Sequence, residues 1–182
     1  MMKQNVKESL SSIGFLKRLA IYGLLTLFLA CTQCAFLTSL DFLPATPDLI
    51  LIMLVAIALL DSNESAAVCA VASGFFVDTV GSAGPALSPL IYFLTVALLS
   101  CFTGKLLKTL PSFLLLMLPA LLCRALGTLL STVAFYRALP PSWMFTDVLL
   151  PEALLCALFA LPVYFLVRLC SALLKKRSRF TF

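Results

Sequence analysis

Two apolar runs between Thr46 and Pro89 are each too short to cross a membrane as an isolated straight helix. The runs are Leu49–Leu60 and Ser65–Val77, and both are bounded by acids. A bilayer core is about 30 Å thick, so a straight spanning helix needs roughly 20 residues. Either each helix extends a turn past its acids, or the two form a shallow re-entrant hairpin. Carboxylates this close to hydrocarbon are costly and become functional candidates; they are Asp48, Asp61, Glu64 and Asp78.

The composition indicates an integral membrane protein. Of the 182 residues, 62% are hydrophobic and only 12% are charged, whereas a soluble domain is about half apolar and about a quarter charged. No stretch is both long and polar enough for a separate water-soluble domain. We therefore expect one transmembrane helical domain over 19–174, preceded by a cytoplasmic segment at 1–18 and followed by a basic cytoplasmic tail at 175–182.

The positive charges indicate how the chain lies in the membrane. Ten of the thirteen Lys and Arg residues fall within 3–18, 105–108 and 175–179. The positive-inside rule places all three groups in the cytoplasm, together with both chain ends. The net charge of +5 is therefore interpreted as a topology signal and not as a nucleic-acid site. Contact of the basic tail with anionic lipid or an acidic partner is the alternative.

The apolar stretches predict an all-α bundle of about six transmembrane helices, with no separate domain inserted between them. Pro47 is suited to open the second helix as its first residue, and Asp61 to Glu64 form a tight inner turn. The expected helices lie at about 19–40, 47–60, 65–77, 86–102, 111–136 and 148–174.

The sequence lacks the residues of the common catalytic and metal sites. There is no histidine, which excludes histidine-based metal sites and Ser/His or Cys/His nucleophile pairs. Seven cysteines all fall in apolar stretches. Cys31 and Cys34 have the spacing of a redox or metal motif but lack a second pair, so we interpret them as packing residues. We expect no enzyme activity, no cofactor and no metal.

The third apolar stretch carries small residues at every fourth position. Ala66, Ala70 and Gly74 share one helical face, and Asp78 ends it. Small residues at this spacing allow two membrane helices to approach closely. One interpretation is a packing face with a surface acid at its end. The other is a pinned junction, in which Asp78 binds the backbone amides of 81–84, a neighbouring helix end or an arginine.

Arg124 lies near the middle of the fifth expected helix, where a charge costs at least ~2.5–3.5 kcal/mol on insertion scales. We expect an ion pair with Asp48, Asp78 or Glu152; a ligand pocket and an intramembrane contact with a partner protein are the alternatives. The charge bias also places Asp48 and Asp78 on the same, outer side. Two close carboxylates repel, so we expect a cation, backbone amides or water to separate them.

Two segments of the chain resemble the MreD family of rod shape-determining membrane proteins. They are Thr46–Leu51, with the sequence TPDLIL, and Gly74–Gly84, with the sequence GFFVDTVGSAG. The family carries a Pro-Asp-Leu start to an early helix and a glycine four residues before an aspartate. The glycines after the aspartate are closer together here than in many members, which predicts a shorter loop. The matching positions are Pro47, Asp48, Gly74, Asp78, Gly81 and Gly84.

The resemblance implies a non-enzymatic protein of the bacterial cell membrane that acts in cell elongation and cell shape. Such a protein partners MreC, a single-span protein, in a complex with MreB, RodA and a class B penicillin-binding protein. It is expected to help control lateral peptidoglycan synthesis. The family fold is also similar to the substrate-binding membrane subunits of energy-coupling-factor transporters. A subunit binding a vitamin-type small molecule is therefore the alternative function.

Overall fold

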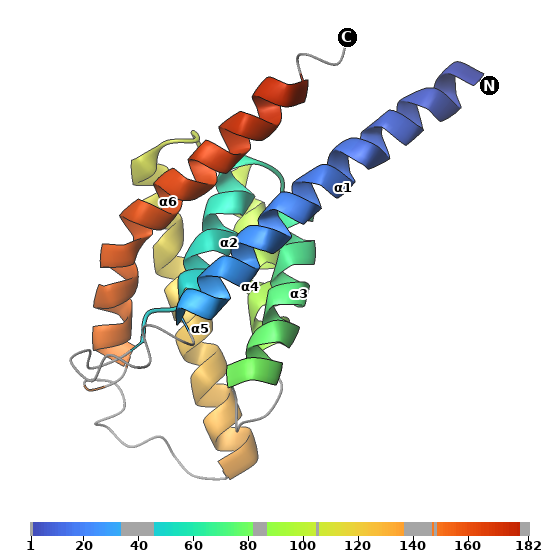
Figure 1. Cartoon of the computed structure of the whole chain (residues 1–182). Coiled ribbons are helices and arrows are strands. Elements are labelled where there is room, and N and C mark those ends of the chain that lie inside the picture. Colours follow the sequence, from blue (N-terminus) through green and yellow to red (C-terminus); the bar gives the residue numbers. More distant parts are fainter. Residues whose placement is uncertain are drawn as a thin grey trace.

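The computed structural model describes residues 2–33, 46–81, 87–104, 106–136, 147 and 149–178. Within these ranges the protein is all-helical and contains no strand, as the sequence predicts (Figure 1). The helices are α1 (Met2–Cys31), α2 (Leu49–Leu60), α3 (Asn63–Gly81), α4 (Ser88–Thr103), α5 (Leu110–Tyr136) and α6 (Leu150–Ser178).

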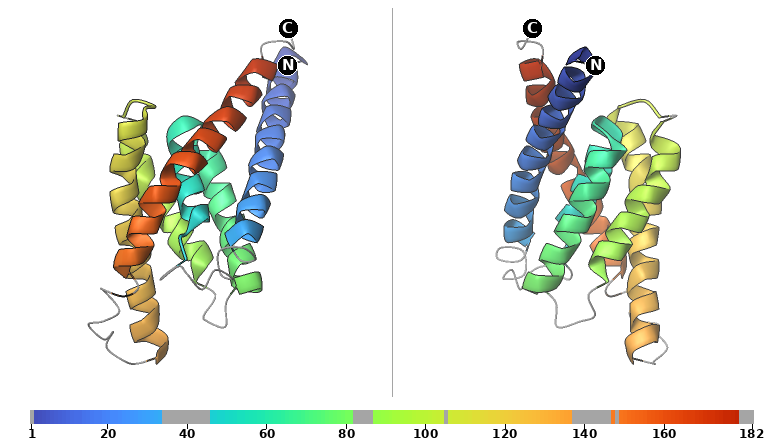
Figure 2. Two further views of the ribbon diagram at one scale, coloured as in Figure 1. Left: turned by 60° about the vertical axis from the view of Figure 1, so that its left-hand side comes forward. Right: turned by 90° about the vertical axis from the view of Figure 1, so that its right-hand side faces the viewer.

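The shortest helix, α2, forms the centre of the bundle. It packs against each of the other five helices, which surround it in Figures 1 and 2. Every one of its twelve side chains is at most 5% exposed. All twelve residues are apolar, and a helix that is apolar on every side belongs in an interior. Because other helices cover α2, it needs no length of its own to match the hydrocarbon.

The expectation that both short helices extend past their acids is wrong for α2 and correct for α3. The α2 helix begins immediately after Asp48 and ends immediately before Asp61. The Asp48 side chain accepts a hydrogen bond from the Leu51 amide. This bond caps the N-terminus of α2, so the helix starts directly after Asp48. By contrast, α3 begins at Asn63, includes Glu64 and continues beyond Asp78 for a total of 19 residues.

Three of the described helices contain stretches that are long and apolar enough to cross a membrane. These stretches are Gly14–Cys31, Leu110–Phe135 and Leu150–Leu174. The outer surface of these helices is rich in exposed leucine, such as Leu122 at 64% exposure. Such a surface suits hydrocarbon, which is as apolar as leucine itself. The fold is thus consistent with membrane association.

The first and last helices extend further than their apolar stretches. The α1 helix begins at Met2, so the predicted segment 1–18 runs into the first apolar helix without a break. It ends at Cys31, and the expected residues 34–40 lie outside the described residues. The α6 helix likewise continues to Ser178, into the predicted basic tail.

The small residues of α3 lie where the bundle is most closely packed. Ala66 and Ala70 are fully buried. A methyl group built on Gly74 would lie 2.9 Å from the carbonyl carbon of Ser88 and closer still to the backbone of Pro89. The first turn of α4 therefore rests directly on the α3 backbone at Gly74, as expected for small residues between membrane helices.

We expect Gly74→Ala to destabilise the protein by about 1–3 kcal/mol, because backbone atoms of α4 must move to admit the methyl group. Thermal unfolding of the detergent-solubilised protein measures the effect. Gly23→Ala in α1 is the matched control, since nothing lies within 4 Å of its added methyl group. The packing argument fails if both variants melt at the wild-type temperature.

Candidate functional site

Arg124 of α5 lies between two carboxylates at the Asp48 end of α2. Its Nε atom is 3.1 Å from Oδ2 of Asp48 and 3.4 Å from Oε1 of Glu152 at the start of α6. The guanidinium carbon also lies 5.9 Å from the centre of the Tyr92 ring, within cation–π range. The structure thus pairs Arg124 with two of the three carboxylates that the sequence offered.

Asp48 is the residue on which this cluster converges, and only 1% of its side chain is exposed. Its Oδ1 accepts from the Leu51 amide at 3.0 Å, and its Oδ2 accepts from the Tyr92 hydroxyl at 2.8 Å. The Asp48 amide donates to Sγ of Cys156 at 3.3 Å. These contacts, with the Arg124 ion pair, tie the start of α2 to α4, α5 and α6.

A residue just beyond the end of α1 reaches the same place. Oε1 of Gln33 accepts a hydrogen bond from the Leu49 amide at 3.1 Å, so a second amide at the start of α2 has a partner. A helix N-terminus leaves four amides without partners inside the helix. In an interior these amides must find other acceptors, and Asp48 and Gln33 supply two of them.

A buried charge of this kind holds helices together because an unpaired charge in the protein interior is energetically costly. Moving a carboxylate out of water costs several kcal/mol, and good geometry with extra hydrogen bonds offsets that cost. Here Asp48 has a guanidinium, a hydroxyl and an amide around its two oxygens. The charges and hydrogen-bond donors of this cluster pair with one another, as expected for a group of residues that joins helices.

Asp78 forms a second junction, between α3 and α4. Its Oδ2 accepts from the Ser88 amide at 3.2 Å. Leu87, the N-cap residue of α4, provides no side-chain capping bond, so a carboxylate from the neighbouring helix does this work. Gly74 lies one helical turn earlier and contacts the same first turn of α4. Of the three partners expected for Asp78, the structure places a neighbouring helix end there.

Asp48 and Asp78 lie toward the same end of the bundle, as the sequence predicts. Asp48 binds Tyr92 and Asp78 binds Ser88, and these two partners are one turn apart on α4. Different groups meet the two charges: a guanidinium and a hydroxyl for Asp48, and a backbone amide for Asp78.

Sequence reasoning missed a matching junction at the other end of α2. Nη1 of Arg18 in α1 is 3.3 Å from Oδ1 of Asp61, whose side chain is only 6% exposed. Nζ of Lys108 donates to the Leu60 carbonyl at 3.0 Å. The charge bias had already placed these groups on one side of the membrane. That signal could have suggested the pairing.

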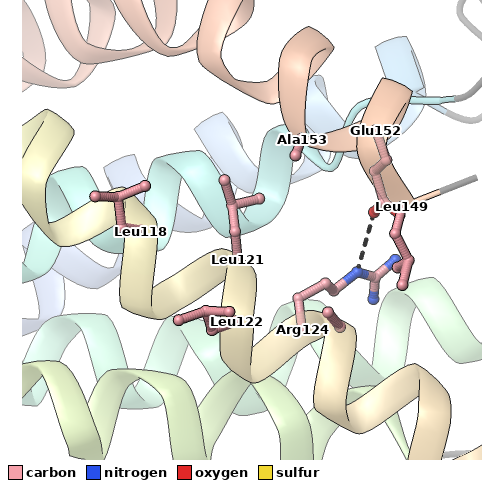
Figure 3. Close-up of a pocket in the computed structure, with 8 residues that line it drawn as sticks. Leu118, Leu121, Leu122, Arg124, Leu149, Glu152 and Ala153 are labelled. Atoms are coloured by element: carbon pink, nitrogen blue, oxygen red, sulfur yellow. Dashed lines mark hydrogen bonds and ion pairs between the residues drawn. The ribbon is translucent and has the colours of Figure 1, made fainter. Parts of the chain in front are cut away.

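A groove of about 250 Å³ lies between α5 and α6 next to Arg124 (Figure 3). In Figure 3 the Arg124 side chain extends from α5 towards Glu152 on α6. Apart from these two charged residues, the lining is leucine and alanine. The lining residues are Leu118, Leu121, Leu122, Arg124, Ala125, Leu149, Glu152 and Ala153.

The remaining site candidates have simpler positions. Pro47 precedes the capping aspartate, and its carbonyl accepts from the Leu49 amide at 3.1 Å. Gly81 is the last residue of α3, and Gly84 lies outside the described residues. Within the described ranges, no group of three or more Cys, Asp or Glu residues could hold a metal ion.

Comparisons with protein-family models, curated proteins and solved structures found no match to this chain.

We expect Arg124→Leu to lower the free energy of unfolding by about 3–5 kcal/mol, because it leaves buried Asp48 without its cation. Chemical denaturation in mixed micelles measures the change. Arg168→Leu is the control, since Arg168 is an exposed arginine in the same membrane domain, and a surface change costs within about 0.5 kcal/mol. Equal losses in the two variants would contradict the junction.

We expect Asp78→Ala to weaken the start of α4 by about 1 kcal/mol, as the loss of a helix cap does. Hydrogen exchange at the first turn of α4 should become faster, while Asp78→Asn, which keeps an oxygen acceptor, should change it less. Thr79→Ala controls for a change at the same end of α3, since the Thr79 hydroxyl donates within its own helix, to the Phe76 carbonyl. Unchanged exchange in Asp78→Ala would rule out the cap.

Proposed function

We propose that this chain is an MreD-type, non-enzymatic scaffold of the bacterial cell membrane. It holds an MreC-like single-span protein within the machinery that elongates rod-shaped cells and so helps control lateral peptidoglycan synthesis. All six helices lie in the membrane, and both chain ends are cytoplasmic. MreB, RodA and a class B penicillin-binding protein join the larger complex.

The proposal rests on the structural roles of the residues that resemble the family. Asp48 fixes the central helix to three others, Gly74 admits the backbone of α4, and Asp78 caps α4. These residues hold helices in place, and the two carboxylates bind groups on neighbouring helices. A protein that positions partners needs such a rigid bundle, with apolar helix faces left free for contact.

The residues that meet at each end of the bundle support the proposed membrane topology. The Arg18–Asp61 ion pair and the Lys108–Leu60 hydrogen bond join three of the regions predicted to be cytoplasmic: the basic start, the inner turn and the basic loop. The start of α1 and the end of α6 lie at one end of the bundle (Figures 1 and 2). Both features follow from six crossings with the two ends inside.

Within the part of the chain that the structure describes, the groove beside Arg124 gives little support to the alternative, a vitamin-binding transporter subunit. Ligand pockets typically enclose about 300–1,000 Å³ and present several polar groups that converge on the ligand. The groove has about 250 Å³, and its two charged residues already bind each other. A likeness of fold to transporter subunits would carry no transport function by itself.

The test is co-expression with the MreC-like single-span protein encoded in the same genome. We expect the two to co-purify through detergent, including when the partner is reduced to its membrane helix and a short flank. An unrelated single-span helix of the same apolar length should not co-purify. Purification without the partner but with a vitamin-sized ligand bound would favour the transporter alternative.

A further inference from the structure

The cluster around Arg124 contains more acidic groups than basic ones. Nε of Arg124 is 3.1 Å from Oδ2 of Asp48 and 3.4 Å from Oε1 of Glu152, so two carboxyl groups meet a single guanidinium. Among the residues that the structure describes, no second cation pairs with either carboxyl group. The cluster therefore carries a net negative charge if both acids are ionised.

This net charge would lie inside the membrane domain. Arg124 is near the middle of the apolar stretch Leu110–Phe135 of α5, and Glu152 lies in the apolar stretch Leu150–Leu174 of α6. The side chains of Asp48 and Glu152 are 1% and 13% exposed. An uncompensated charge is costly both in hydrocarbon and in a protein interior. We therefore expect the cluster to become neutral by binding one positive charge.

A proton suits this cluster better than a metal ion does. Both acids contact the same nitrogen of Arg124, and the guanidinium repels a second cation from the space between them. Within the described ranges, no group of three or more Cys, Asp or Glu residues could hold a metal ion. An isolated acid that is buried usually avoids the cost of its charge by remaining protonated.

The contacts of the two acids indicate which one keeps the proton. Asp48 accepts hydrogen bonds from the Leu51 amide and the Tyr92 hydroxyl in addition to its ion pair. Each of these contacts stabilises the charged form of a carboxyl group. The carboxyl group of Glu152 has no described partner except Nε of Arg124, and that bond is long at 3.4 Å. The proton therefore belongs on Glu152.

The other titratable groups of the cluster do not change its charge near neutral pH. Tyr92 of α4 and Cys156 of α6 both contact Asp48. Both are uncharged at neutral pH, because the ordinary pKa values of tyrosine and cysteine are about 10 and about 8.5. The guanidinium of Arg124 stays charged throughout. The charge of the described cluster is thus decided by its two carboxyl groups.

We infer that Glu152 is a proton-binding site and keeps its proton at neutral pH, so that the cluster of Asp48, Arg124 and Glu152 is neutral. The proton resides on Oε2, and Oε1 still accepts the hydrogen bond from Nε of Arg124 that Figure 3 shows. Release of this proton to water at alkaline pH returns a negative charge to the junction and weakens the attachment of α6. This inference goes beyond the scaffold function and does not depend on the partner.

Infrared spectroscopy of the chain in an ester-free detergent tests the inference, because a protonated carboxyl group has a carbonyl band separate from the bands of a carboxylate. We expect a carboxyl band at neutral pH that Glu152→Gln removes. Glu64→Gln is the matched control and should leave this band unchanged, since Glu64 is an exposed glutamate at the start of α3. Cell-free synthesis with glutamate labelled with carbon-13 at the side-chain carboxyl should shift the band, which distinguishes Glu152 from Asp48.

Thermal unfolding at increasing pH gives a second readout. An unfolded glutamate loses its proton at about pH 4.3, so the folded chain binds a proton at neutral pH that the unfolded chain has released. Stability must then fall as the pH rises through the value at which Glu152 loses this proton. Glu152→Gln mimics the neutral acid and keeps an acceptor oxygen. It should melt at the wild-type temperature at neutral pH and lose this part of the alkaline decrease, whereas Glu64→Gln should retain the decrease.

Three results would overturn the inference. They are the absence of a Glu152-dependent carboxyl band at neutral pH, a band that labelled glutamate does not shift, and a Glu152→Gln variant that melts well below the wild type at neutral pH. The last result is expected if an ionised Glu152 forms a stabilising ion pair. The labelling experiment uses the wild-type chain, so it does not depend on the folding of a variant. The co-purification experiment measures the scaffold function separately, so failure of these tests leaves that function intact.

Discussion

The carboxylate of Asp48 must be neutralised inside the bundle, and the arrangement of the helices around α2 follows from this requirement. The carboxylate is buried because it caps a helix that is itself enclosed. A buried carboxylate needs a cation and donors, which come from Arg124 of α5 and Tyr92 of α4. Arg18 meets Asp61 at the opposite end in the same way. The central helix is thus held at both ends by charges and along its length by apolar contacts.

Two sets of contacts hold α4, one from the central helix α2 and one from α3 at the side. Asp48 reaches α4 through the Tyr92 hydroxyl from inside the bundle, whereas Asp78 and Gly74 of α3 hold its first turn.

The sequence predicts the helices and the candidate partners of Arg124 because both rest on strong local signals: long apolar stretches and the cost of a charge in hydrocarbon. It could not predict that α2 is central. Lipid-facing and protein-facing residues are equally apolar, so hydropathy cannot separate an enclosed helix from an exposed one. The length argument also favoured a helix that extends a turn past its acids, which is wrong for α2, because its caps lie at Asp48 and Asp61. Likewise, the contact of the Asp48 amide with Cys156 joins residues that are distant in sequence, and no local pattern marks it.

The central claim is that Asp48 and Arg124 stabilise the fold as a pair. A double-mutant cycle with Asp48→Asn and Arg124→Gln, followed by reversible unfolding in mixed micelles, measures their coupling free energy. The structure predicts a favourable coupling of about 2–3 kcal/mol, at the upper end for residues in direct contact. Additive losses, with a coupling near zero, would contradict the account.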